Sequence, residues 1–185
     1  LKFSDIKNQK ISKFSTSFLR SLNKRLVWCA SSTHPGEEKI IAESHKILKQ
    51  KFKNLLTIII PRHTQRINEI NDEINSLDLN TIIRTTRKKI ENNTDIYLVD
   101  TYGETKKFFN ISKIAFIGGS LVKHGGQNPI EPARFQLNII HGPYVNNFRD
   151  IYSFFNKKKI SYKITSTSQL VNVAEKLLKN KKKKK

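Results

Sequence analysis

Five short segments of the sequence, each directly after an apolar run, hold the residues whose types could do chemistry. They are residues 31–37, 61–63, 100–104, 118–132 and 141–143. If the apolar runs are parallel strands, their carboxyl ends lie along one edge of the sheet, which is where such sheets bind ligands. The sequence therefore predicts that the five segments converge to form a binding cleft.

Glycines in the fourth segment favour an anion as the ligand. The segment opens on Gly118, Gly119 and Ser120, and Gly125 and Gly126 lead into an expected helix near residues 128–132. Glycine lets backbone amides come close to an anion, and a helix start adds free N–H groups. The segment matches neither a Walker loop nor a dinucleotide-binding fingerprint. A tight turn that needs glycine for its own backbone is the alternative interpretation.

Three side chains in these segments suit other parts of a nucleotide or sugar. Arg62 follows an apolar run and a proline, and its planar guanidinium suits bidentate capture of phosphate or carboxylate. Asn128 and Glu131 are three residues apart, so they share one face of a helical turn. A carboxylate there can accept two hydrogen bonds from a vicinal diol. The alternatives that need no ligand are an exposed surface arginine and a simple N-terminal capping pair.

Histidines are frequent in the same segments, where we find His34, His63, His124 and His141. None of their spacings matches a zinc-binding pair, so we interpret them as hydrogen-bonding residues and expect no metal ion. The fifth histidine, His45, lies within an expected helix and is predicted to be at the surface.

Alternating apolar runs and helical patterns must position these residues. The expected strands cover residues 26–30, 55–60, 81–84, 96–99, 114–117, 137–140 and 162–164. The expected helices cover residues 35–51, 67–74, 104–110, 128–132, 147–156 and 168–178. Strands that read as continuous apolar runs between helices indicate βαβ units. The predicted fold class is α/β, a Rossmann-like parallel sheet with helices on both faces. We expect a linker or N-terminal extension over residues 1–24, one domain over 25–178, and a disordered poly-Lys tail over 179–185.

Charge is the strongest global feature, since 35 Lys and Arg residues against 15 Asp and Glu residues give a net charge of +20. Such an excess suggests a polyanionic partner. No helix-turn-helix, zinc-finger or RNP-type pattern is present, so nucleic acid is disfavoured and an anionic phospholipid surface is preferred. No apolar run reaches the roughly 18–20 residues that span a bilayer. The single cysteine, Cys29, excludes an internal disulfide, and we expect a soluble, intracellular chain.

Together the motifs resemble the C-terminal domain of the 3-deoxy-D-manno-octulosonic acid (Kdo) transferases. The resemblance extends from about residue 25 to about residue 155, and Leu1-Lys2-Phe3 resembles the family's interdomain junction. The matching segments are Ser32-Thr33-His34-Pro35-Gly36-Glu37, Pro61-Arg62-His63, Val99-Asp100-Thr101-Tyr102-Gly103-Glu104, Ile117-Gly118-Gly119-Ser120-Leu121, His124-Gly125-Gly126-Gln127-Asn128-Pro129-Ile130-Glu131-Pro132, and His141-Gly142-Pro143 with Asn147-Phe148.

The resemblance implies one half of a GT-B glycosyltransferase that inverts the anomeric centre and uses no metal ion or other cofactor. In this family the C-terminal domain binds the donor CMP-Kdo, and the N-terminal domain holds the lipid A precursor and the general base. The family acts in lipopolysaccharide biosynthesis, on the cytoplasmic side of the bacterial inner membrane. The implied donor-binding residues are Arg62, His63, Tyr102, Gly103, Glu104, Gly118, Gly119, Ser120, Gly126, Asn128 and Glu131, with Ser32, His34, His124 and His141 as secondary candidates.

The resemblance also implies a role for several of these residues. Arg62 would pair with the anionic groups of the donor, and residues 118–120 would face its phosphate or its Kdo group. Asn128 and Glu131 would hold the ribose or the adjoining sugar, and Tyr102 would lie against the cytosine.

No catalytic residue is expected in this chain, because the N-terminal domain that carries the base is not part of it. We therefore expect that the chain alone binds CMP-Kdo weakly or not at all and transfers no sugar. One alternative is a basic Rossmann-like module that binds nucleic acid or an anionic membrane without catalysis. Another is a GT-B enzyme or a sugar epimerase that uses a different nucleotide sugar, because this fold serves many functions.

Overall fold

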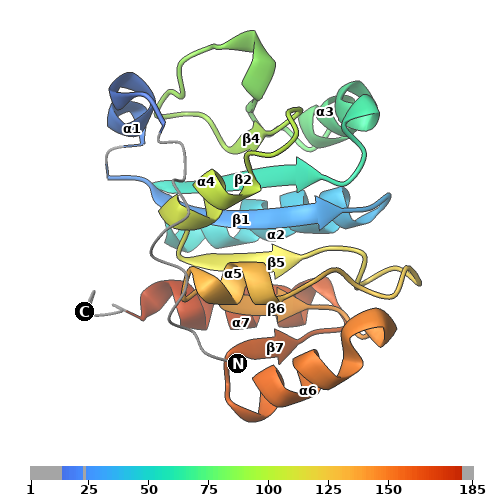
Figure 1. Cartoon of the computed structure of the whole chain (residues 1–185). Coiled ribbons are helices and arrows are strands. Elements are labelled where there is room, and N and C mark those ends of the chain that lie inside the picture. The colour runs from blue at the N-terminus through green and yellow to red at the C-terminus, as the bar shows by residue number, and fades with distance from the viewer. Residues whose placement is uncertain (1–13, 23, 181–185) are drawn as a thin grey trace.

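The computed structural model describes residues 14–22 and 24–180, which form a seven-stranded sheet between two layers of helices (Figure 1). The strands are β1 (Leu26–Thr33), β2 (Leu55–Pro61), β3 (Thr81–Ile83), β4 (Ile96–Leu98), β5 (Ile114–Ile117), β6 (Asn138–His141) and β7 (Ser161–Lys163). Their order across the sheet is β3-β4-β2-β1-β5-β6-β7, and every neighbouring pair is parallel. The predicted α/β fold class is confirmed.

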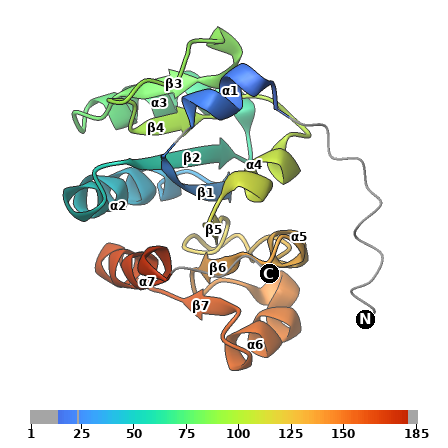
Figure 2. The same cartoon turned by 90° about the vertical axis from the view of Figure 1, so that its left-hand side faces the viewer.

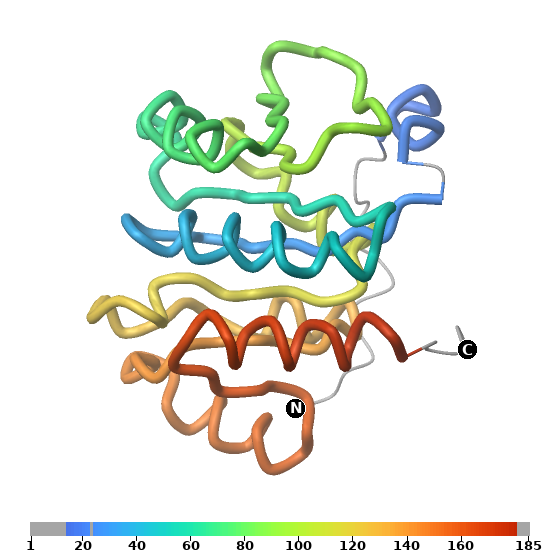
Figure 3. The backbone as a smooth tube through the Cα atoms, turned by 180° about the vertical axis from the view of Figure 1, so that it is seen from behind, coloured from blue at the N-terminus to red at the C-terminus, as the bar shows by residue number. Residues whose placement is uncertain are grey.

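Helices cover both faces of the sheet, as Figure 2 and the rear view in Figure 3 show. One face packs against α2 (Glu37–Lys51), α3 (Ile67–Asn75) and α7 (Thr167–Lys179). The other packs against α1 (Thr16–Ser21), α4 (Thr105–Ile111), α5 (Ile130–Arg134) and α6 (Arg149–Lys157). Short 3₁₀ turns occur at Thr64–Arg66, Arg84–Thr86 and Asn146–Phe148.

The central strands are apolar along their whole length because each of their faces is buried under helices. In β1, Trp28 and Ala30 pack toward α2 and α7, whereas Val27 and Cys29 pack toward the opposite layer. This period-two alternation between two buried faces is what produces the continuous apolar runs in the sequence. Cys29 is fully buried in this core.

Helix α1 covers a part of the sheet that the chain between β3 and β4 leaves open. That described connection, residues 84–95, contains a 3₁₀ turn but no α-helix. The ring centroid of Phe14 lies 4.9 Å from that of Phe108, and the ring centroid of Phe18 lies 5.5 Å from that of Tyr97. Residues 14–22, which the sequence assigned to a linker or extension, therefore pack against the domain that begins at residue 25. The predicted poly-Lys tail lies almost wholly outside the described residues.

The prediction that His45 is at the surface is wrong, because its side chain is fully buried. Positions 41, 45 and 48 share the face of α2 that packs on the sheet, and Ile41 and Leu48 are buried beside it. The imidazole is satisfied there by two polar partners. Its Nδ1 lies 2.7 Å from Thr57 Oγ1, and its Nε2 lies 3.3 Å from Asp95 Oδ1.

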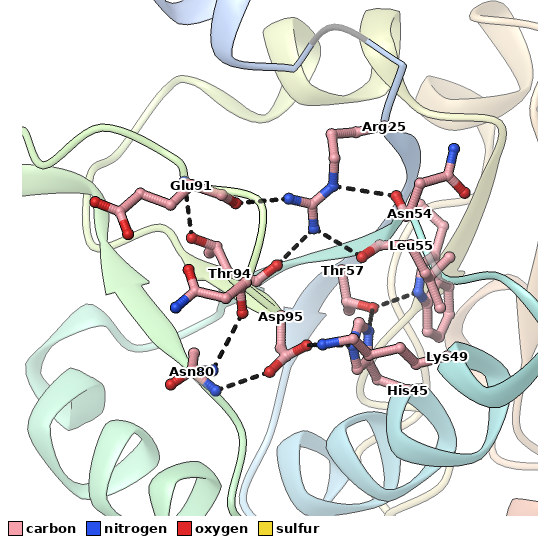
Figure 4. Close-up of polar contacts among 12 residues, drawn as sticks. Arg25, His45, Lys49, Asn54, Leu55, Thr57, Asn80, Glu91, Thr94 and Asp95 are labelled. Carbon is pink, nitrogen blue, oxygen red and sulfur yellow. Dashed lines mark hydrogen bonds and ion pairs between the residues drawn. The ribbon is translucent and has the colours of Figure 1, made fainter.

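Asp95 is the centre of this buried polar network, which Figure 4 shows. Besides His45, its carboxylate accepts hydrogen bonds from the Lys49 ammonium and, at 2.9 Å, from the backbone N–H of Asn80. Burial alone would raise the pKa of Asp95, but the hydrogen bonds from His45, Lys49 and Asn80 lower it from 3.8 to about 2. Next to it, the Arg25 guanidinium donates to the backbone carbonyls of Asn54, Leu55, Glu91 and Thr94.

Candidate functional site

Four of the five predicted segments meet at the carboxyl edge of the sheet, where backbone hydrogen bonds join them. The chain order reverses between β1 and β5, which are neighbours in the sheet. This is the switch point at which doubly wound sheets bind ligands. The bonds between segments are Gly118 N to Ser31 O at 2.8 Å and Arg62 N to Thr33 O at 2.9 Å. Tyr144 N, directly after the segment 141–143, donates to Ser120 O at 2.9 Å, and Gly126 N to Gly119 O at 2.8 Å closes the loop after β5 on itself.

Gly118 is required by the close contact between the segments after β1 and β5. A Cβ atom at this position would lie 2.3 Å from the carbonyl oxygen of Ser32 and 2.6 Å from Thr33 Cα. Ser32 itself has a φ of +55° and lies at a break in the β1–β2 register. Its carbonyl is thus turned against the glycine. The tight-turn interpretation accounts for Gly118 without a ligand.

A buried carboxylate, that of Glu37, occupies the amides of the glycine-rich loop. Its side chain is fully buried, and Oε1 accepts from the backbone N–H groups of Ser120 and Leu121 at 3.0 and 2.9 Å. Its Oε2 accepts from the backbone N–H groups of His34 and Gly119 at 2.9 and 2.8 Å. The amides that the sequence analysis assigned to a donor phosphate are therefore bound internally. Glu37 fixes the loop, and an external anion needs other donors.

Ser120 and Gly126 also make contacts within the fold. Ser120 is fully buried, and its hydroxyl donates to the carbonyl of Ile117 at 2.6 Å and accepts from the N–H of Gly142 at 2.8 Å. Gly126 has a φ of +79°, and a Cβ atom there would lie 3.0 Å from Val145 Cα. Both residues hold the loop after β5 against the loop after β6.

Three histidines gather beside Arg62 at the switch point. The His34 ring centroid lies 4.0 Å from that of His124 and 6.0 Å from that of His63, with the latter edge-on. Arg62, His63 and His124 are exposed, whereas His34 is 4% exposed. Burial lowers the pKa of His34, and the neighbouring His124, His63 and Arg62 lower it further. This group of cationic and titratable side chains is suited to an anion.

His141 does not join this group. It is fully buried, its Nδ1 lies 2.7 Å from the carbonyl of Gly142, and its Nε2 lies 3.2 Å from Asn156 Oδ1. Its ring packs on Tyr152 with the centroids 4.3 Å apart. Burial lowers its pKa, which favours the neutral form, so His141 links β6 to α6 as a packing residue.

The segment after β4 forms its own ion-pair cluster. Glu104 pairs with the Arg84 guanidinium through two bonds of 3.0 Å and accepts from Lys107 at 3.0 Å and from Thr101 Oγ1 at 2.5 Å. The bonds from Arg84 are the main reason that the pKa of Glu104 falls to about 2. Glu104 is thus saturated by internal partners. Tyr102 and Gly103 are exposed in the turn before it, with the tyrosine 73% exposed.

A cavity of about 680 Å³ lies beside this cluster rather than at the switch point. It is lined by α1 and by residues 84–90, and Glu104 and Thr101 form part of its wall. The sequence analysis did not anticipate it, because the packing of α1 on the domain was not predicted.

Asn128 and Glu131 lie at the start of α5, as expected, although the helix begins at Ile130. Asn128 Oδ1 accepts from the backbone N–H of Ile130 at 2.9 Å, which forms an Asx turn before the helix. The N-cap residue of α5 is Pro129, and no side chain caps this helix, so the predicted capping pair of Asn128 and Glu131 does not form. Glu131 is about two-fifths exposed and lies 3.7 Å from Lys106 Nζ. Asn128 is exposed with its side-chain oxygen bound within the turn, whereas Glu131 is partly exposed beside Lys106.

The described part of the chain contains neither a metal-binding cluster nor a membrane-spanning helix. Within residues 14–22 and 24–180, no three His, Cys, Asp or Glu side chains are grouped so that they could hold a metal ion. None of the helices in these ranges is long and apolar enough to cross a membrane.

The sequence is similar to curated transferases. It matches no family model. It is 40% identical over 166 residues to the 3-deoxy-D-manno-octulosonic acid transferase of Haemophilus influenzae, covering 89% of this chain and 39% of that protein. It is 34% identical to a bifunctional glycosyltransferase/methyltransferase of Fusobacterium nucleatum, covering 94% of this chain and 26% of that protein. The chain thus spans less than half the length of these relatives.

A solved structure decides the assignment. The C-terminal CMP-Kdo binding domain of WaaA from Acinetobacter baumannii superposes with a TM-score of 0.80 at 30% identity, covering 85% of this chain and 82% of that one. The chain belongs to the Kdo transferase family. It corresponds to the C-terminal domain of these enzymes, as the motifs predicted. An α,α-trehalose 6-phosphate synthase of Burkholderia multivorans, at 12% identity and a TM-score of 0.53, shares the fold alone.

Within this Kdo transferase domain, Glu37 is the important residue that sequence reasoning missed. The sequence placed it in the segment after the first strand but assigned it no binding role. A useful signal was its position, since Glu37 follows Pro35 and Gly36 in a motif of the family. Its partners lie 82 to 84 residues further along the chain, so no local pattern could identify them.

Proposed function

We propose that this domain binds CMP-Kdo and forms the donor half of an inverting glycosyltransferase that transfers Kdo to a lipid A precursor. The similarity to the CMP-Kdo binding domain of WaaA is the observation that carries the proposal. The site is the carboxyl edge at the β1–β5 switch point, where Arg62 and three histidines offer positive charge.

The residues divide into two roles under this proposal. Arg62 binds an anionic group of the donor, since its guanidinium is exposed and its backbone N–H is fixed by Thr33. Glu131 accepts from a sugar diol, and Tyr102 offers an exposed ring to the cytosine. Glu37 and Ser120 shape the loop without meeting the donor. The general base and the acceptor site lie in a domain outside these 185 residues.

The net charge of +20 supports a peripheral position on anionic phospholipid, at the cytoplasmic face of the inner membrane. Such a surface would bring the donor site close to a lipid acceptor. Binding to vesicles that contain anionic lipid, compared with neutral vesicles at the same salt concentration, tests this part of the proposal.

Calorimetric titration of the 185-residue chain with CMP tests the function. We expect saturable binding that is stronger for CMP than for UMP. Arg62→Ala should weaken CMP binding by about 10- to 100-fold, since a hydrogen bond to a charged group contributes about 1.5–3 kcal/mol. Glu131→Ala should also weaken it, whereas Arg20→Ala on α1 should leave it unchanged.

Two outcomes would contradict the proposal. A folded chain that binds no nucleotide would show that this domain does not form a donor site by itself. Tight binding of a generic single-stranded oligonucleotide, with a steep dependence on salt and no preference for CMP, would favour a basic nucleic-acid module instead. With CMP-Kdo and a lipid A precursor supplied, we expect no transfer by this chain alone, and robust transfer would place the general base within it.

A further inference from the structure

The contact between His34 and His124 brings together two imidazoles from different loops at the switch point. His34 follows β1 and His124 lies in the loop after β5, yet their ring centroids are 4.0 Å apart. Both rings lie against Gly119. A Cβ atom there would be 3.1 Å from His34 Cε1 and 3.2 Å from His124 Cδ2. A glycine at position 119 therefore leaves the space that the paired rings fill.

One nitrogen of this pair has no partner. His34 Nδ1 lies 3.0 Å from the carbonyl oxygen of Ser32, so the neutral ring carries its proton on Nδ1 and donates to that carbonyl. His34 Nε2 is buried and makes no hydrogen bond. An unsatisfied buried polar atom is unfavourable, and natural structures seldom retain one without a functional reason.

Among the described residues, charged and titratable groups from three loops lie near His34. Glu37, on the same turn, has Oε2 at 4.0 Å from His34 Nδ1, but its two oxygens already accept four backbone N–H groups. His124, His63 and Arg62 supply positive or potentially positive charge from the loops after β5 and β2. Burial and these neighbours lower the pKa of His34, so protonation of its ring is disfavoured. A bound anion would reverse that balance.

We infer that His34 and His124 are a proton-dependent subsite for an oxyanion of the donor, which they bind together with Arg62. Protonation turns His34 Nε2 into a donor, and an oxyanion is the acceptor that satisfies it. Because His124 is exposed and stacked on His34, we expect its ring to move when the anion enters. Binding takes up protons, and anion affinity rises as the pH falls. The identity of the oxyanion as the phosphate or the carboxylate of CMP-Kdo rests on the proposed function.

Sulfate is the first probe, because its charge is constant between pH 5 and 8, whereas a phosphate monoester ionises within that range with a pKa of about 6. The side-chain signals of the histidines, followed by NMR during sulfate titrations at several pH values, report both affinity and protonation. We expect affinity to increase about tenfold per pH unit for each proton taken up, and to level off at low pH. The signals of buried His141 should not respond.

Single substitutions distinguish sulfate binding by the two histidines from a general effect of positive charge. His124→Ala removes an exposed ring, so the fold should persist and the pH dependence of sulfate binding should weaken. His34→Gln should abolish it. Lys123→Ala is the matched control, because it removes an exposed cation next to His124 without removing an imidazole, and the pH dependence should remain. Titrations with CMP and with free Kdo then show whether the phosphate or the carboxylate is the bound group.

The results distinguish failure of this inference from failure of the proposed function. Sulfate affinity that does not vary with pH, or that varies equally in His124→Ala, would overturn the subsite even if CMP binds. Proton-linked sulfate binding through His34 and His124, in a chain with no preference for CMP, would support the subsite and overturn the proposed donor.

Discussion

Substitution of Glu37 with glutamine tests how far one buried carboxylate stabilises the loops at the β1–β5 switch point. The change keeps the shape of the side chain but replaces one carboxylate oxygen with an NH₂ group. Each oxygen of Glu37 accepts two backbone N–H groups, so the NH₂ group would face two donors and satisfy neither. The remaining amide oxygen would also lose its charge.

The expected loss in the free energy of unfolding follows from these contacts. A hydrogen bond to a charged group contributes about 1.5–3 kcal/mol, and two such bonds are lost, so we expect the free energy of unfolding to fall by about 3–6 kcal/mol. For a domain of this size, 1 kcal/mol corresponds to about 2–4 °C in Tm. The variant should therefore unfold at a temperature at least about 6 °C lower. Much of the total stability of a typical domain would be lost.

Urea unfolding followed by circular dichroism measures the free energy directly. The control is Glu43→Gln on the same helix, a half-buried glutamate whose loss should change the free energy of unfolding by less than about 0.5 kcal/mol. The amide signals of Gly119, Ser120 and Leu121 should shift in the Glu37 variant. If Glu37→Gln unfolds within about 1 kcal/mol of the unaltered chain, the carboxylate does not organise this loop in solution.

Two further predictions concern stability. Because the pKa of Asp95 is lowered from 3.8 to about 2, its ionised carboxylate contributes fully to the free energy of unfolding above about pH 4, and this contribution is lost as the pH falls through about 2. Asp95→Asn should therefore reduce the fall in the urea unfolding midpoint on acidification, whereas Asp72→Asn, at an exposed position, should leave that fall unchanged. Phe18→Ala should lower the free energy of unfolding by about 1–3 kcal/mol, since its half-buried ring contacts Tyr97. An unchanged Tm would show that α1 does not pack on the domain in solution.

The sheet could be predicted from the sequence because a strand buried on both faces leaves a continuous apolar run. For β2, the run of residues 55–60 located the strand to within one residue, and Pro61 proved to be its last member. Helix starts were less accurate. The helix expected at residue 147 begins at Arg149 after a 3₁₀ turn, because a 3₁₀ turn and an α-helix share similar local patterns.

The sequence predicted where in the fold the candidate site lies, but not the contacts between its side chains. Chain order and strand ends located the edge, since parallel topology alone brings Arg62, His34 and His124 there. The partners of Glu37 and His45 were beyond sequence reasoning. Asp95 lies 50 residues from His45, and a polar residue in mid-helix resembles a surface position until such a distant partner is known.

The packing of α1 also determines where this domain can be cut. A fragment that begins at residue 25, where the strand pattern starts, would lack the aromatic rings of Phe14 and Phe18. Tyr97 and Phe108 are buried at 2% and 0% exposure, and removal of these rings would uncover apolar surface beside them. Exposed apolar patches promote association between molecules. Recombinant production of this domain therefore needs a boundary before residue 14, because a cut at the first strand would leave an aggregation-prone face.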